Sequence, residues 1–108
     1  MSIINVDFAP LQLISKLRSD HFTGWKIAES DEYSYLWQKG PCFNLDGISG
    51  EDAAEEVYEI YNNPNRLDDK WRLFLSGSID VGDIVTVDGV SFYCAHFGWT
   101  KLYDRNSN

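Results

Sequence analysis

Cysteines, cations and long apolar runs are all scarce in this sequence. Only two of its 108 residues are cysteines, Cys42 and Cys94, too few for the disulfide framework of small secreted domains, so we expect reduced thiols. No apolar run approaches the roughly 18–20 residues of a membrane-spanning helix. Residues 1–10 also lack the charged start and apolar centre of a secretory signal. These absences predict a soluble, cytoplasmic protein without a membrane partner.

Positively charged residues are also scarce. Nine Lys and Arg stand against 17 Asp and Glu, which gives a net charge of −8. A field of this sign repels phosphate backbones and anionic lipids and attracts cationic partners. Direct binding of nucleic acid is therefore not expected. Acidity is also a common route to solubility, so charge alone does not establish a binding function.

Catalytic signatures are absent as well. The glycines are dispersed, so there is no phosphate-binding loop, and no G-x-S-x-G occurs. Cys94 and His96 lie two residues apart, but no oxyanion-hole sequence accompanies them. A zinc site made of Cys94, His96, Cys42 and His21 is the sharpest alternative, although no C-x-x-C supports it. We expect no enzyme activity, no cofactor and no metal.

The strongest structural signal lies in residues 78–102. Two β-rich runs, 84–87 and 90–93, flank Asp88-Gly89, a pair typical of a type I′ hairpin turn because both positions take positive φ. The turn pairs Val87 with Val90. Strand alternation then places five side chains on one face, which we expect to face the core: Val85, Val87, Val90, Phe92 and Cys94.

Helical spacing of apolar residues predicts helices over residues 9–20 and 51–62. The second helix follows Ser49-Gly50-Glu51-Asp52, which is close to a capping box. Its inward stripe is Ala53, Val57, Ile60 and Tyr61. Its outer face is acidic and holds Glu51, Asp52, Glu55, Glu56 and Glu59. Like charges at this spacing cost about 0.2–0.5 kcal/mol per pair, so we interpret this face as a partner-binding surface.

Residues 25–37 are predicted to form a second hairpin. Its acidic tip carries Glu29, Asp31 and Glu32, and alternation places Tyr33, Tyr35 and Trp37 in one row. Such a row could stack a base, a sugar or a partner's side chains, or it could be covered by a helix. Residues 1–8 are predicted as an edge strand, 38–50 as a loop and 66–75 as an extended segment, while 99–103 extend the sheet beyond Gly98.

These elements predict a single α+β domain over residues 1–108. Two helices pack on a small, mostly antiparallel sheet, and the C-terminal hairpin lies at its centre.

The C-terminal half resembles the YodL-like proteins, small proteins of bacteriophages and other mobile elements. The resemblance is carried by the helix from Glu51, by the strand entry, by the turn at 88–89 and by the segment that closes the motif. The matching residues are Ser78, Ile79, Val81, Gly82, Asp83, Ile84, Val85, Phe92, Tyr93, Cys94, Gly98 and Trp99. Asp80 departs from the pattern, which usually has Ser there. The resemblance implies a small α+β phage-type domain and brings no catalytic residues.

The functional hypothesis combines the charge with this resemblance. We expect a phage- or mobile-element-encoded protein that binds a basic surface on a host nucleic-acid-handling protein, such as a restriction or CRISPR effector. Carboxylates would compete there with phosphates, and the protein would inhibit its target by mimicking DNA. It would act as a monomer or homodimer. The alternatives are a small-ligand-binding module that uses the aromatic row and a self-associating structural phage protein.

Overall fold

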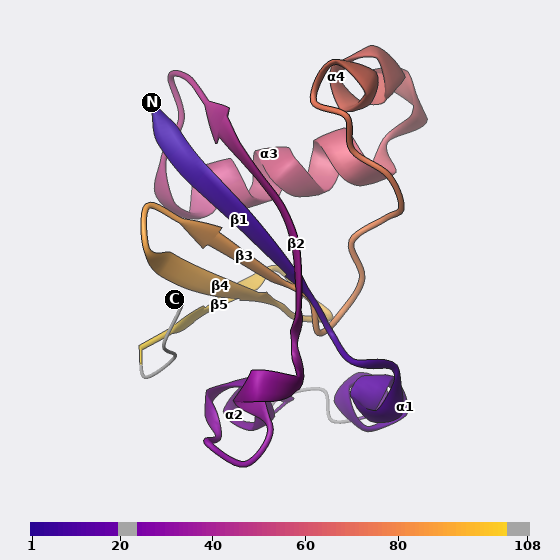
Figure 1. The fold of residues 1–108 in the computed structure, drawn as a ribbon, viewed down its shortest axis with the longest axis vertical. Coiled ribbons are helices and arrows are strands. Elements are labelled where there is room, and N and C mark those ends of the chain that lie inside the picture. Colours follow the sequence, from indigo (N-terminus) through magenta and orange to yellow (C-terminus); the bar gives the residue numbers. More distant parts are fainter. Residues whose placement is uncertain (20–23, 104–108) are drawn as a thin grey trace.

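The computed structural model describes residues 1–19 and 24–103. Five strands form one antiparallel sheet in the order β2-β1-β3-β4-β5 (Figure 1). The strands are β1 (Ser2–Phe8), β2 (Gln38–Leu45), β3 (Ile84–Val87), β4 (Val90–Cys94) and β5 (Trp99–Leu102). The described helices are α1 (Leu11–Ser19), α2 (Gly24–Glu29), α3 (Gly50–Asn62) and α4 (Leu67–Arg72), with 3₁₀ turns η1 (Ser34–Leu36) and η2 (Pro64–Arg66). The predicted α+β class is confirmed.

The hairpin of β3 and β4 forms with the predicted register. Val87 lies opposite Val90 and Val85 opposite Phe92. Asp88 and Gly89 both have positive φ, at 50° and 85°, as a type I′ turn requires. Asp88 also joins the turn to β1, because its Oδ1 accepts a hydrogen bond of 2.8 Å from the Ile3 amide.

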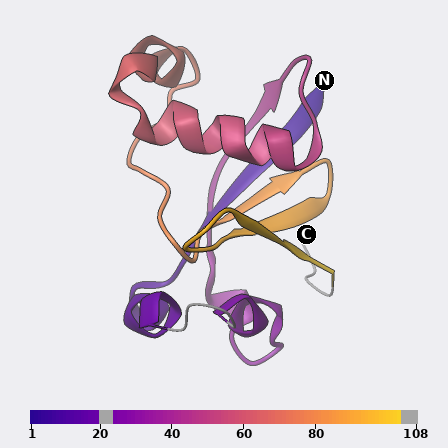
Figure 2. The same ribbon diagram turned by 180° about the vertical axis from the view of Figure 1, so that it is seen from behind.

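Both faces of this hairpin are buried, whereas the sequence interpretation assigned the core to one. Val85, Val87, Phe92 and Cys94 pack under α3 as expected, but Val90 is 36% exposed beside the turn. The opposite face is covered by α1 and α2, where Ile84 and Tyr93 pack against Leu13, Leu17 and Ala28. Figures 1 and 2 show α3 at one end of the molecule and α1 and α2 at the other.

The prediction of a hairpin over residues 25–37 is wrong. This segment forms helix α2 and the 3₁₀ turn η1, so the aromatic side chains do not form a row. Tyr33 is half-buried, Tyr35 is 75% exposed and Trp37 is 6% exposed. The Trp37 indole donates a hydrogen bond of 2.8 Å to the carbonyl of Gly82. Trp37 is thus part of the core, and the stacking surface that would have held a small ligand is not formed.

Three other segments also differ from expectation. β1 is not an edge strand, because it pairs with both β2 and β3. The predicted loop over 38–50 contains β2, an edge strand whose pairing with β1 shifts register opposite Gly40 and Pro41, and proline is tolerated at edges and irregularities of this kind. Residues 66–75 are not a strand: Arg66 ends η2, residues 67–72 form α4, and residues 73–75 follow that helix in neither a helix nor a strand. The sequence does carry a helix signal there, with Asp68 and Asp69 in the first turn of α4 and basic residues in its last.

The predicted helices are confirmed as α1 and α3, and the residues after Gly98 extend the sheet as β5. The inner stripe of α3 is buried. Ser49 precedes α3 in an extended conformation, but its side chain makes no capping hydrogen bond, so the capping box does not form. Asn62, at the end of α3, exchanges two hydrogen bonds of 2.8 and 2.9 Å with the backbone of Ile79. None of the described helices is long and apolar enough to cross a membrane.

Candidate partner-binding site

The acidic side chains of α3 do not form a uniform surface. Glu51, Asp52 and Glu55 are exposed, whereas Glu56 and Glu59 are half-buried. The face therefore divides into an open N-terminal half and a C-terminal half that contacts the following turn and helix.

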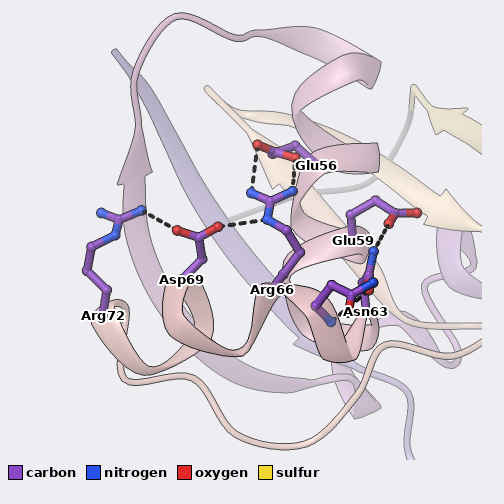
Figure 3. Close-up of polar contacts among 7 residues, drawn as sticks. Glu56, Glu59, Asn63, Arg66, Asp69 and Arg72 are labelled. Carbon is purple, nitrogen blue, oxygen red and sulfur yellow. Dashed lines mark hydrogen bonds and ion pairs between the residues drawn. The ribbon is translucent and has the colours of Figure 1, made fainter.

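Arg66 occupies the C-terminal half (Figure 3). Its Nη1 and Nη2 donate to the two carboxylate oxygens of Glu56 at 2.9 and 3.2 Å, and its Nε donates to Asp69 Oδ2 at 2.7 Å. The hydrogen bond from Arg66 holds the pKa of Glu56 below its usual range. Glu59 accepts a hydrogen bond of 3.2 Å from Asn63 Nδ2. These two carboxylates thus serve internal contacts that fasten the end of α3.

The N-terminal half carries the charge that remains available. Within the described residues, no ion pair involves Glu51, Asp52 or Glu55. All three lie on one rigid helix of 13 residues. Of the five predicted partner-binding residues of α3, these three are the exposed ones, and Glu55 also accepts a hydrogen bond from Trp99 of β5.

The second predicted acidic group lies elsewhere. Glu29 ends α2, and Asp31 and Glu32 follow it, so this group lies at the other end of the molecule from α3 (Figures 1 and 2). Glu29 also accepts a hydrogen bond of 2.7 Å from the Tyr103 amide. The two acidic groups do not form one continuous surface, and the α2 group does not extend the site on α3.

A pocket of about 270 Å³ adjoins the open half of α3. It lies between α3, residues 80–81 and the β4–β5 connection, and we call it the Trp99 pocket. Its lining is Glu55, Tyr58, Asp80, Val81, Cys94, Ala95, His96, Gly98 and Trp99. The indole Nε1 of Trp99 donates a hydrogen bond of 3.0 Å to Glu55 Oε2. The Tyr58 and Trp99 rings meet edge to face, with centroids 6.3 Å apart and planes at 85°.

The electrostatic character of this pocket is negative. Two carboxylates, Glu55 and Asp80, lie in its lining, and none of the lining residues is Lys or Arg. Burial, together with the charges of Asp83, Asp80 and Glu55, raises the pKa of the Cys94 thiol to about 12. Cys94 is therefore a protonated thiol at neutral pH and is unsuited to act as a nucleophile.

Comparisons with known protein families, with curated proteins and with solved structures found no match to this chain. The relation to YodL-like proteins therefore stays a prediction, and the chemistry of the site is argued from its own residues.

The four residues of the zinc alternative are not brought together. Cys42 lies on β2 and Cys94 on β4, with β1 and β3 between them. Three strand spacings amount to about 14 Å, which is too far for two ligands of one ion. His21 lies outside the described residues. Within the described part of the chain, no group of three or more His, Cys, Asp and Glu could hold a metal.

Sequence reasoning missed the Trp99 pocket because its walls come from three separate segments. Glu55 and Trp99 are 44 residues apart. The local signal was limited to Glu55 and Tyr58, whose spacing of three places them on neighbouring positions of a helix surface. Carboxylates beside aromatic rings can bind an organic cation, through charge and through the negative ring faces. That is the chemistry that this arrangement supports.

Proposed function

We propose that this protein is a non-enzymatic, acidic interaction protein that binds a basic surface on a protein partner. The observation that carries the proposal is the exposure of Glu51, Asp52 and Glu55 on one helix, without an ion pair in the described structure, beside a pocket lined by carboxylates and aromatic rings. A rigid array of this kind loses little conformational entropy on binding.

The partner class follows from the charge. Proteins that handle nucleic acids carry Lys and Arg where phosphates bind, and carboxylates on α3 would compete for those positions. A protein whose phosphate-binding positions are occupied in this way would no longer bind nucleic acid and would be inhibited. The resemblance to phage and mobile-element proteins supports a host defence protein, such as a restriction or CRISPR effector, as the target. The protein would then act in the host cytoplasm, as a monomer or homodimer.

The test uses two double variants that remove the same charge. Asp52→Asn with Glu55→Gln neutralises the open half of α3, whereas Asp31→Asn with Glu32→Gln neutralises the group after α2. Each protein is immobilised and exposed to nuclease-treated bacterial lysate, and bound proteins are eluted with duplex DNA. The wild type and the α2-side variant should retain the same DNA-eluted proteins, and the α3 variant should lose them. Equal retention by both variants would remove α3 from the proposal.

The kinetics of a captured partner give a second measurement. Electrostatic attraction mainly speeds association and is screened over about 10 Å at 0.1 M salt. The association rate of the wild type should therefore fall with added salt, and the α3 variant should associate more slowly and with a shallower salt dependence. An association rate independent of salt would contradict charge-driven binding.

Self-association is a second candidate, favoured by the surface of α4. Leu67, Trp71 and Phe74 are exposed. The spacing of four places Leu67 and Trp71 on one face of α4, and Phe74 lies two residues after the end of that helix. Sedimentation of the wild type and of Trp71→Ala distinguishes the two functions. A stable oligomer that Trp71→Ala dissociates would support a structural role, and a monomer in both proteins would exclude it.

A further inference from the structure

We propose that the Trp99 pocket receives a single arginine side chain of the partner. This inference rests on the proposed function, because it names the group on the basic partner that the open half of α3 would guide into place. An arginine bound in this pocket would fix where the partner sits on α3, which attraction between opposite charges alone does not.

The size of the pocket suits one side chain. Its volume of about 270 Å³ falls just below the roughly 300–1,000 Å³ of pockets that enclose whole small molecules. Two nearly perpendicular rings, Tyr58 and Trp99, form part of its lining. Aromatic rings in this arrangement offer both a face and an edge to an incoming group, and a planar cation stacks on the face.

Glu55 is held in position to receive the cation. The hydrogen bond from Trp99 Nε1 engages Oε2 of its carboxylate at 3.0 Å. That bond joins β5 to α3 and restricts the rotamers of Glu55, while Oε1 can still accept from a guanidinium. A carboxylate that is already oriented gives up less side-chain entropy when the ion pair forms.

Asp80 supplies the second carboxylate, and an arginine of the chain itself already approaches it. Nη2 of Arg18 lies 3.7 Å from Asp80 Oδ2, and the two side chains are 52% and 62% exposed. Exposed ion pairs at this distance are weak, so a partner's arginine can displace Arg18 at small cost.

Arginine suits this lining better than lysine. The guanidinium is planar, is weakly hydrated, stacks on aromatic rings and donates from several nitrogens in fixed directions, so it can stack and bond to a carboxylate at the same time. The ammonium of lysine is a compact and strongly hydrated charge that loses more on entering a pocket with aromatic walls. The pocket is therefore expected to discriminate between two residues of equal charge.

The experiment titrates the whole protein with three blocked peptides, Gly-Arg-Gly, Gly-Lys-Gly and the neutral isostere Gly-citrulline-Gly. Binding is followed by NMR through the indole N–H signals, and the signal of Trp99 is assigned with Trp99→Phe. The arginine peptide should shift the Trp99 signal and leave those of Trp25, Trp37 and Trp71 in place. The lysine peptide should bind at least threefold more weakly, and the citrulline peptide should cause no shift.

Variants separate the pocket from the general charge of α3. Glu55→Gln and Asp80→Asn should each weaken arginine binding at least threefold. Asp52→Asn removes an equal charge one turn away on the same helix, outside the pocket lining, and should weaken it less than twofold. Equal effects of Glu55→Gln and Asp52→Asn, equal binding of lysine and arginine, or a shift with citrulline would each overturn the arginine pocket. If the arginine peptide leaves Trp99 unshifted while DNA-eluted partners still depend on Asp52 and Glu55, this inference fails and the proposed function stands.

Discussion

Arg66 and Glu56 form a two-point ion pair between η2 and α3, with nitrogen-to-oxygen distances of 2.9 and 3.2 Å. The same guanidinium reaches Asp69 on α4, so one side chain joins three consecutive elements (Figure 3). This contact explains why the acidic face of α3 is only partly available to a partner. It also makes the stability of the C-terminal end of α3 depend on pH.

Glu56→Gln should lower the free energy of unfolding by about 0.5–1 kcal/mol at pH 7, the range of a partly exposed ion pair with good geometry. In the native state Arg66 lowers the pKa of Glu56 from 4.5, so its stabilisation is complete above pH 4.5 and is lost as the pH falls through the lowered pKa. Urea unfolding at several pH values should show the difference between wild type and variant shrinking on acidification. Glu32→Gln, the control, should show little difference at any pH.

Asp83→Ala should be strongly destabilising, by about 2–4 kcal/mol, because it leaves buried amides without acceptors. Asp83 is buried, and its two oxygens accept hydrogen bonds of 2.8 Å from the amides of Ala9 and Asp80. Burial raises the pKa of Asp83 above 3.8. Its contribution to stability is therefore largest below pH 3.8 and decreases as the pH rises through the raised pKa. Unfolding curves of both proteins from pH 3 to 7 measure this, and a loss below 1 kcal/mol throughout would contradict the role given to Asp83.

Phe74→Gly should raise the free energy of unfolding by about 1 kcal/mol, since a non-glycine residue in the left-handed region costs roughly 1–2 kcal/mol. Phe74 has φ of 56° at the end of α4 and is 93% exposed, so glycine removes the strain and forfeits little burial. Phe97 is 89% exposed and has no positive φ, which makes Phe97→Gly the matched control. Chemical unfolding should show stabilisation for position 74 and none for 97. Identical effects would disprove the strain at Phe74.

The two free cysteines should react at very different rates. Cys42 is exposed on β2, whereas Cys94 is buried and its pKa is raised to about 12. Iodoacetamide at pH 7.5 should therefore label the native protein at Cys42 alone, and both residues should react in urea. Mass spectrometry of the labelled peptides measures the extent of labelling at Cys42 and at Cys94. Rapid labelling of Cys94 in the native state would be inconsistent with its burial under α3.

The sequence correctly predicted the elements that depend on residues close together in the chain. Asp88 and Gly89 tolerate the positive φ that a type I′ turn requires, which identified the hairpin. The helical spacing of apolar residues over 53–61 identified α3 and the face that it buries. Trp71, Leu73 and Leu75 alternate like a strand, yet Arg66 and the charged ends of α4 favour the helix that forms. There the charge pattern was more informative than the apolar alternation.

The remaining errors concern contacts between distant segments. Gly40 and Pro41 are typical of a loop, but a Cβ at Gly40 would lie 2.5 Å from a ring carbon of Phe8, so the glycine serves the close pairing of β2 with β1. The β-favouring residues of 33–37 were assigned to a strand, although Trp37 is held by Gly82, 45 positions away. The pocket around Trp99 depends on the same kind of long-range pairing, which composition and spacing do not encode.

The inner position of β1 has a consequence for biosynthesis. Residues 2–8 leave the ribosome well before residues 84–87, which complete one side of that strand. The sheet cannot close until β3 has been translated, and pairing over such a separation is slow. The sheet is therefore completed only after β3 has emerged, and an unfinished product that ends before Ile84 would expose an open strand edge of β1 to chaperones and proteases.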